Sequence, residues 1–229
     1  MTITPDSIVI ASIGEVRINA TLFYTWLIMA ILVIASWLIT RRLSIEGPIS
    51  RRQNFLEVVV DYIRGQIREI VVDKPEPYIA FLGSLFLFIS ISNFLSFVPV
   101  YHAPTGSLYT TSALALCVFL AVPFFGVRRK GVRGYLKHYV EPSIVMLPFN
   151  IISEFSRTLA LAVRLFGNVM SGTLITAVLL SFVPLFVPVI MHLFELLIGQ
   201  IHAYIFAVLA TVYIASSTRI QEQELHNNA

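Results

Sequence analysis

The chain has 229 residues, of which 57% are hydrophobic and only 13% are charged. Soluble domains carry about a quarter of charged residues, so this composition excludes an ordinary water-soluble fold and indicates a membrane protein that crosses the bilayer several times. The excess of 16 basic over 13 acidic residues is too small to indicate a nucleic-acid partner, and the single cysteine, Cys117, excludes a disulfide framework and a cysteine-rich zinc site.

The first part of the chain predicts three membrane helices and one amphipathic helix. The three apolar stretches are residues 22–40, 78–98 and 108–127. Each reaches the roughly 20 residues that an upright membrane helix needs. Between the first two, residues 44–76 alternate charged and apolar side chains at the spacing of a surface helix, which lies along the membrane or against a partner. Pro75 and Pro77 are expected to end this helix.

Two basic clusters, at residues 41–52 and 128–137, predict the orientation in the membrane. Lys and Arg concentrate in cytoplasmic connections, so we expect residues 41–77 and 128–140 in the cytoplasm and the mixed segment 1–19 outside. Arg128, Arg129 and Lys130 are expected to stop the third span. An odd number of crossings places the C-terminus in the cytoplasm.

Residues 141–181 form one apolar stretch about twice as long as an upright span needs. It is either two spans without a proper turn or one long, steeply tilted helix, and the lack of a Gly, Asn, Asp or Ser cluster favours the single helix. Pro184 and Pro188 are expected to make the next turn, and residues 189–216 form a last long helix. The predicted fold is an all-α polytopic membrane protein, a single membrane domain with about five membrane helices, the last two long and tilted, plus one amphipathic surface helix.

Arg164 lies in the middle of the long stretch, with no acidic residue three or four positions away on its own helix. An arginine at the centre of a bilayer costs roughly 3 kcal/mol on insertion scales, so its counter-charge must come from another helix or another chain. At about 100° per residue, a narrow polar line about 60° wide contains Asn150, Arg157, Arg164, Asn168 and Ser171. Glu154 can pair with Arg157 three positions later.

The last helix carries a second polar line. At about 100° per residue, the members of this line fall within roughly 80° and are His192, Glu195, Gly199 and His202, with Gln200 well off it. His and Glu on one face can pass a proton along the helix. Histidine takes up and releases a proton near neutral pH, and a glutamate does so once burial raises its pKa. The structural alternatives are an internal salt bridge between Arg164 and Glu195, and packing or backbone-bonding roles for His192 and Asn168.

Several of these segments resemble subunit a of F-type ATP synthases. The run 156–168, with its core Arg164-Leu-Phe-Gly-Asn168, is similar to the signature of that family, and residues 203–214 resemble its last helix. Residues 93–99 and 104–111 resemble an earlier membrane hairpin, so that the resemblance covers most of residues 20–217. The overall pattern is most similar to an alternate bacterial branch, of which some members move Na⁺.

The resemblance implies a membrane stator that lies beside a rotating ring of c subunits, together with b-type peripheral stalk subunits, in the bacterial inner membrane. Arg164 matches the essential arginine that faces the ring carboxylate between two half-channels for H⁺ or Na⁺. Implied ion-pathway residues are Asn150, Asn168, His192, Glu195, Gln200 and His202. Where relatives often carry acidic residues, this chain has Thr173 and Ser107.

Two other functions would predict different features of the sequence. A stand-alone secondary ion transporter would predict internal repeats and a broken helix near the midplane, and the sequence has no repeat. A membrane scaffold would give Arg164 no purpose. The sequence also lacks a phosphate-binding loop, so we expect no nucleotide, no other cofactor, no metal and no catalytic site of the chain's own.

Overall fold

The computed structural model describes residues 5–13, 16–41, 51–71, 75–98, 101–140, 144–182 and 187–218. The predicted fold class is confirmed, since five of the described helices are long and apolar enough to cross a membrane. The helices are α1 (Ala20–Thr40), α2 (Arg51–Ile70), α3 (Glu76–Phe94), α4 (Leu108–Val140), α5 (Met146–Phe182) and α6 (Val187–Thr218). Short 3-10 turns are η1 (Pro5–Ser7), η2 (Leu95–Phe97) and η3 (Pro104–Gly106).

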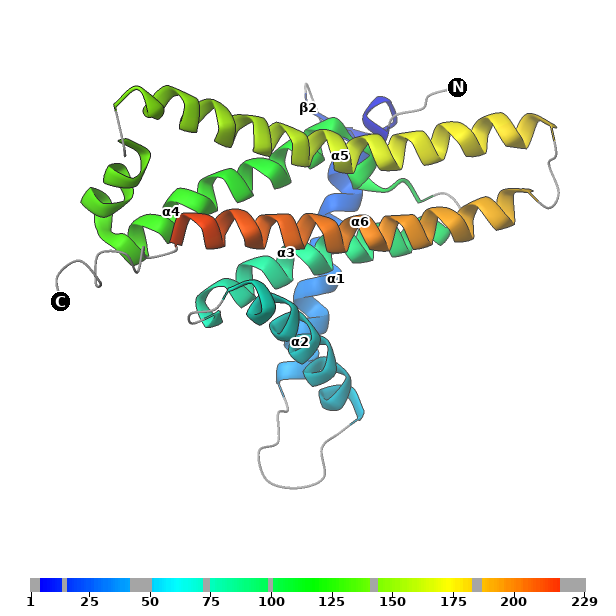
Figure 1. The fold of residues 1–229 in the computed structure, drawn as a ribbon. Coiled ribbons are helices and arrows are strands. Elements are labelled where there is room, and N and C mark those ends of the chain that lie inside the picture. Colours follow the sequence, from blue (N-terminus) through cyan, green and yellow to red (C-terminus); the bar gives the residue numbers. More distant parts are fainter. Residues whose placement is uncertain are drawn as a thin grey trace.

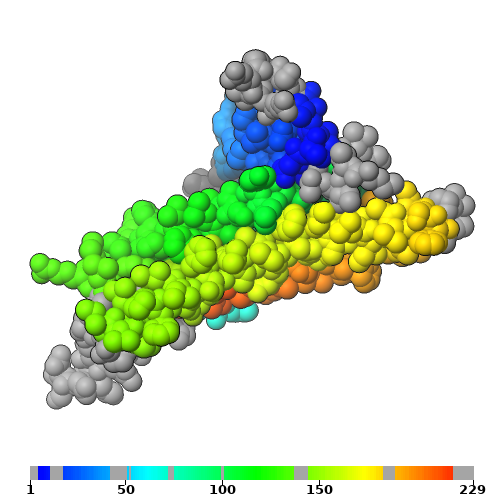
Figure 2. Space-filling model, turned by 90° about the horizontal axis from the view of Figure 1, so that it is seen from above, coloured from blue at the N-terminus to red at the C-terminus, as the bar shows by residue number. Residues whose placement is uncertain are grey.

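The four helices α3 to α6 pack side by side, while α1 runs across them (Figure 1). α5 and α6 form an antiparallel hairpin. α4 packs against both of these helices, and α3 packs against α6. The space-filling view shows α5 lying along α4 (Figure 2). The side chains that are almost fully buried at these contacts include Leu82, Ile89, Val118, Leu161, Leu165 and Ile214. This stack is therefore the core, and α1 contributes little to it, because most of its large apolar side chains are exposed.

The long apolar stretch forms one unbroken helix, as the sequence predicts. α5 has 37 residues and is therefore about 55 Å long at 1.5 Å per residue. Pro148 does not break it, because it occupies the third helical position, where the backbone N–H has no helical partner to lose. Pro184, which we expected in the following turn, lies outside the described residues.

Two predicted helix ends are wrong. α2 ends at Ile70, and Pro75 and Pro77 begin α3 instead of ending α2, because proline is well suited to the first turn of a helix. The helix that contains the third span does not end at the basic cluster 128–130 either. α4 continues through it to a break at Gly131, whose φ of 74° is in the left-handed region that favours glycine. A second helical piece then runs to Val140.

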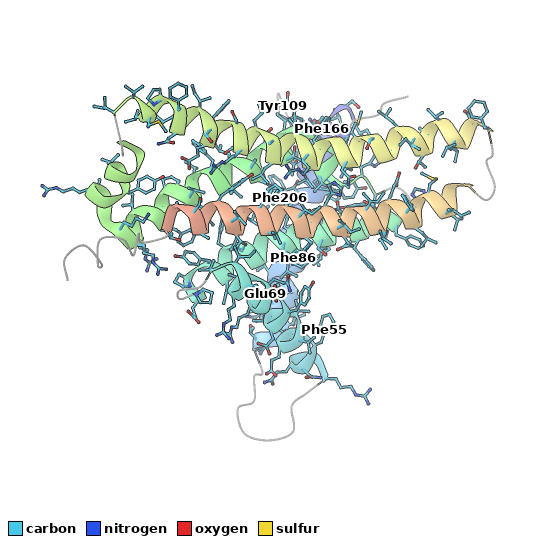
Figure 3. All side chains as sticks on the ribbon, in the orientation of Figure 1. Phe55, Glu69, Phe86, Tyr109, Phe166 and Phe206 are labelled. Carbon is cyan, nitrogen blue, oxygen red and sulfur yellow. The ribbon has the colours of Figure 1, made fainter. Side chains whose placement is uncertain are left out.

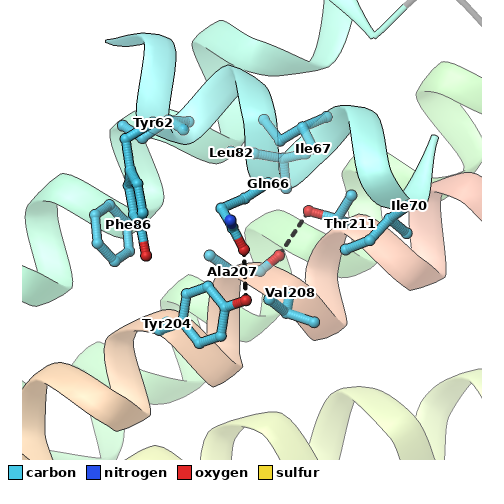
Figure 4. Close-up of a pocket in the computed structure, with 11 residues that line it drawn as sticks. Tyr62, Gln66, Ile67, Ile70, Leu82, Phe86, Tyr204, Ala207, Val208 and Thr211 are labelled. Atoms are coloured by element: carbon cyan, nitrogen blue, oxygen red, sulfur yellow. Dashed lines mark hydrogen bonds between the residues drawn. The ribbon is translucent and has the colours of Figure 1, made fainter. Parts of the chain in front are cut away.

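The amphipathic helix α2 packs against the bundle on one side. Its buried residues Ile63 and Ile67 face α3 and α6, and Gln66 accepts a hydrogen bond from the Tyr204 hydroxyl of α6 (Figure 4). Phe55 is exposed, and Tyr62 is also largely exposed although it lies beside Phe86 of α3 at the edge of this contact (Figure 4). The apolar periodicity in the sequence thus corresponds to a contact within the chain as well as to an exposed stripe.

A small antiparallel hairpin, which the sequence did not predict, precedes α1. Its strands are β1 (Val9–Ile13) and β2 (Val16–Asn19), with Val9 opposite Asn19 and Ile13 opposite Val16. The backbone carbonyl of Ile8 accepts a hydrogen bond from the N–H of Ala20 and so links the hairpin to the first turn of α1.

Candidate functional site

A cavity of about 300 Å³ lies where the end of α3, the connection 101–106, the middle of α5 and the first half of α6 meet. Three of the predicted site residues line it: Asn168, His192 and Glu195. Further polar side chains in its wall are Asn93, Ser96, His102, Ser171 and Thr173. The structure therefore brings parts of the two predicted polar lines together around one cavity. It adds α3 and the 101–106 connection, which sequence reasoning did not assign to this site.

Glu195 is held by groups from α5 and α6. Its Oε1 accepts a hydrogen bond of 2.6 Å from the Thr176 hydroxyl, and its Oε2 lies 3.4 Å from His192 Nδ1. Only 21% of the Glu195 side chain is exposed. Gly172 makes the close approach possible, because a Cβ at that position would lie 3.2 Å from Glu195 Oε1. Sequence reasoning missed Thr176 and Gly172, although both belong to a run of small and polar residues on α5.

The wall on the α3 side is built from buried hydrogen bonds. Asn93 Nδ2 donates to the carbonyl oxygen of Gly199 at 2.8 Å, and the Thr105 hydroxyl donates to Asn93 Oδ1 at 2.9 Å. Gln200 Nε2 donates to the carbonyl oxygen of Ser90, whose hydroxyl donates back to the Gln200 amide oxygen. Gln200, which the sequence suggested as an ion-pathway residue, is therefore used in the α3–α6 contact and does not line the cavity.

Arg164 lies on the exposed side of α5, whereas Leu161 and Leu165 are buried on the side that faces the bundle. Within the described residues, no carboxylate oxygen lies within 4.0 Å of its guanidinium group. The internal salt bridge to Glu195 is not formed, since Glu195 packs at Gly172, eight residues and about 12 Å further along α5. The neighbouring Arg157 differs, because its guanidinium lies 5.7 Å from the ring centre of Tyr213.

The surface beside Arg164 is open to a close neighbour. A Cβ built on Gly167, three residues on, would have no atom of another described segment within 4 Å. Large apolar side chains project from the exposed sides of both helices (Figure 3). They include Phe155, Leu159 and Val163 on α5 and Leu197 and Ile201 on α6. An exposed cation thus lies within an apolar surface that has a small-residue gap next to it.

The remaining predicted residues, His202 and Asn150, lie away from the cavity. His202 is half-buried, and its Nδ1 is 3.0 Å from the carbonyl oxygen of Ile198 in the preceding turn. Asn150 is near the start of α5, 18 residues and about 27 Å before Asn168. The predicted site residues therefore fall into three places along the α5–α6 hairpin: the cavity, the region of Arg164, and the start of α5.

Comparisons with known proteins agree on one family. The sequence model of the family described as ATP synthase A chain matches residues 22–215. The chain is 58% identical to "ATP synthase subunit a 2" of Picosynechococcus sp. over 98% of this chain and 96% of the relative. It is 55% identical to "ATP synthase subunit a 2" of Acaryochloris marina over 100% and 98%. It is also 53% identical to "ATP synthase subunit a" of Albidiferax ferrireducens over 96% and 95%.

Proposed function

Because the chain belongs to the ATP synthase A chain family and thus to the membrane sector of an F-type ATP synthase, we propose that it is the ion-translocating stator of that enzyme. In this role it forms two half-channels beside a ring of c subunits and couples the flow of H⁺ or Na⁺ to rotation of the ring. The observation that carries the proposal is the exposed guanidinium of Arg164, which has no carboxylate partner within the described chain.

The counter-charge of Arg164 comes from the ring in this proposal. A carboxylate on a passing helix, about 4 Å from the guanidinium, would be attracted by about 4 kcal/mol at an effective dielectric constant of 20. This attraction favours the ionised carboxylate and expels its bound ion. The open space at Gly167 allows a neighbouring helix to approach closely. Arg164 therefore acts as an electrostatic gate, with no covalent chemistry.

The cavity around Glu195 supports an outer half-channel. It combines a carboxylate, an imidazole and several amide and hydroxyl groups, which are groups that transfer protons or bind a cation. Asn150, at the other end of α5, belongs to the inner half-channel. Arg164 lies between Asn150 and the cavity along α5, as a gate that separates two ion paths must. His202 is an ion-pathway residue on α6 at about the level of Arg164, since α6 pairs Glu195 with Gly172 and Tyr213 with Arg157.

The orientation and partners follow from the same proposal. The N-terminus lies outside and the C-terminus lies in the cytoplasm of a bacterial cell, with the protein in the inner membrane. A c-subunit ring contacts the exposed side of α5 and α6, and b-type stalk subunits hold the chain against rotation. Lipid covers α1, whose exposed residues Trp26, Val33 and Trp37 are apolar.

Replacement of Arg164 by Ala tests the gate. We expect Arg164→Ala to abolish ATP synthesis in vesicles that contain the complete complex and to permit passive ion flow, because no fixed charge then opposes a neutralised ring carboxylate. Arg164→Lys keeps the charge without the planar head group and should leave the passive flow low. The measurements are synthesis and flux after an imposed ion gradient. ATP synthesis retained in Arg164→Ala at more than a few per cent would contradict the gating role.

A further inference from the structure

We propose that Asp6 is the acidic residue that draws the coupling ion to the outer end of the cavity. This inference rests on the proposed function, because it assigns a role to Asp6 in the uptake of the ion that the half-channels carry. It concerns a residue in the N-terminal segment, which precedes the membrane helices and is distant in sequence from the rest of the pathway.

The carboxylate of Asp6 is fixed by hydroxyl groups of two other segments. The Ser107 hydroxyl lies 2.8 Å from both carboxylate oxygens, and the Thr21 hydroxyl donates to Oδ1 at 2.6 Å. Ser107 is fully buried at the start of α4, and Thr21 is buried in the first turn of α1. These contacts hold a negative charge at one position, between η1, η3 and α1, over a sequence separation of 101 residues.

This position is at the wall of the cavity. Pro5 and Gly106, which immediately precede Asp6 and Ser107, both line the cavity. A Cβ on Gly106 would lie 3.4 Å from Val169 Cγ1 of α5 and 4.0 Å from Pro5 Cδ. The turns η1 and η3 therefore form this part of the cavity wall, and the Asp6 carboxylate, which does not itself line the cavity, is held next to the lining residues Pro5 and Gly106. Asp6 itself is only half-buried, so its charge acts on both the cavity and the solvent.

Within the part of the chain that the structure describes, no other carboxylate lies at this end of the cavity. Glu57, Asp61 and Glu69 are on α2, Glu76 begins α3, and Glu154 is near the start of α5. Glu195 is inside the cavity. Clefts lined by charges of one sign raise the local concentration of the opposite ion by about tenfold or more, and a single fixed carboxylate beside the wall acts in the same direction. Asp6 is thus placed to raise the occupancy of the path that leads to Glu195.

The test is the dependence of ATP synthesis on the ion concentration on the outer side. Proton and Na⁺ gradients are first applied to vesicles with the wild-type complex, and the ion that drives synthesis is used. Asp6→Asn keeps a hydrogen-bond acceptor of nearly the same shape but removes the charge. We expect it to raise the half-saturating concentration about threefold to tenfold, with the maximal rate within twofold. Added choline chloride should reduce the difference, because salt screens a charge effect.

Two further variants separate the charge from a purely structural role, in which Asp6 only fastens η1 to α1 and α4. Thr21→Val removes one hydroxyl donor and retains the charge, so the half-saturating concentration should stay near that of the wild type. Asp6→Asn combined with Ser107→Asp returns a carboxylate to the same place and should restore it. An unchanged half-saturating concentration in Asp6→Asn, or an equal shift in Thr21→Val, would overturn the proposal. The Arg164→Ala result would still stand on its own in that case.

Discussion

The environment of Glu195 shows how single residues determine what a buried carboxylate can do. The Thr176 hydroxyl fixes one oxygen at 2.6 Å, His192 lies 3.4 Å from the other, and Gly172 leaves the space for both. The carboxylate thus has a hydroxyl donor on one side and an imidazole on the other, and within the described residues it has no arginine or lysine partner. In the proposed function this leaves Glu195 able to exchange an ion with the cavity, whereas a salt bridge to Arg164 would hold it in place.

This arrangement predicts a graded response to mutation. We expect Glu195→Gln to slow ion transport at least tenfold while the complex still assembles, because an amide neither exchanges a proton nor carries the negative charge that attracts a cation. Thr176→Val removes one hydrogen bond, worth about 1 kcal/mol, and should slow transport by a smaller factor. Ser181→Ala is the matched control on α5, because the exposed Ser181 hydroxyl bonds only to the carbonyl oxygen of Val178 in its own helix. If Glu195→Gln blocks assembly and leaves transport per complex normal, Glu195 is structural.

At the scale of whole helices, the contact between α3 and α6 depends on polar and small residues. Helices in lipid gain no hydrophobic free energy by associating, so close packing and hydrogen bonds between helices stabilise their contacts. Asn93 meets Gly199 directly, and a Cβ on Gly199 would lie 3.0 Å from the Asn93 Cβ. The pair Ser90 and Gln200 adds hydrogen bonds one turn away. This contact sets the position of the α6 segment that carries Glu195.

The α3–α6 contact can be weakened at a single residue. We expect Asn93→Ala to remove the hydrogen bonds to Gly199 and from Thr105, to lower the stability of the protein by about 1–3 kcal/mol, and to reduce the yield of folded protein. Ser84→Ala, also on α3, should have no such effect, because its exposed hydroxyl bonds only to the Phe81 carbonyl oxygen of its own helix. Thermal unfolding in detergent measures both. Equal stability of the two variants would show that the buried network contributes little.

At the scale of the whole molecule, the α5–α6 hairpin leaves a broad apolar surface that contains two exposed arginines, of which Arg157 lies against the Tyr213 ring and Arg164 has no such contact within the described residues. Soluble proteins do not expose such surfaces, and in a membrane they face lipid or another subunit. Lipid is a poor neighbour for the guanidinium of Arg164, because charge at bilayer depth is costly. A partner helix with a carboxylate would offset this free-energy cost by pairing with the guanidinium. Gly167 has no side chain, so it leaves space for such a helix to approach. The surface next to Arg164 is therefore where we expect the ring.

Disulfide crosslinking checks this interface. In a Cys117→Ser background, which has no other cysteine, Gly167→Cys should crosslink to a cysteine placed next to the ring carboxylate. Ala162→Cys should not, because Ala162 is 3% exposed and faces the inside of the bundle. The readout is the appearance of an a–c product on non-reducing gels. Absence of a product from Gly167→Cys with every ring position tried would remove the proposed interface.

The sequence by itself determined the number of membrane helices, the unbroken length of α5 and the isolation of Arg164 from acids on its own helix. These properties depend on hydrophobic length and on residue spacing along one helix, which are local. The sequence also contains the Arg164–Asn168 motif. The family that this motif indicated, subunit a of F-type ATP synthases, is confirmed. The ends of α2 and of the third span were wrong because sequence signals could not show that Pro75 starts a helix or that only Gly131 breaks α4.

Only the tertiary structure decided which helix faces meet. Asn168 of α5 and Glu195 of α6 line the same cavity. Gln200 donates a hydrogen bond to Ser90, and Thr176 donates one to the Glu195 carboxylate. Asp6 of the N-terminal segment also accepts a hydrogen bond from Ser107, which is 101 residues away in the sequence. Helical periodicity specifies the direction of a side chain around its own axis, but the neighbour it meets depends on how helices far apart in the sequence cross. That crossing is fixed by contacts between segments, which no local pattern contains.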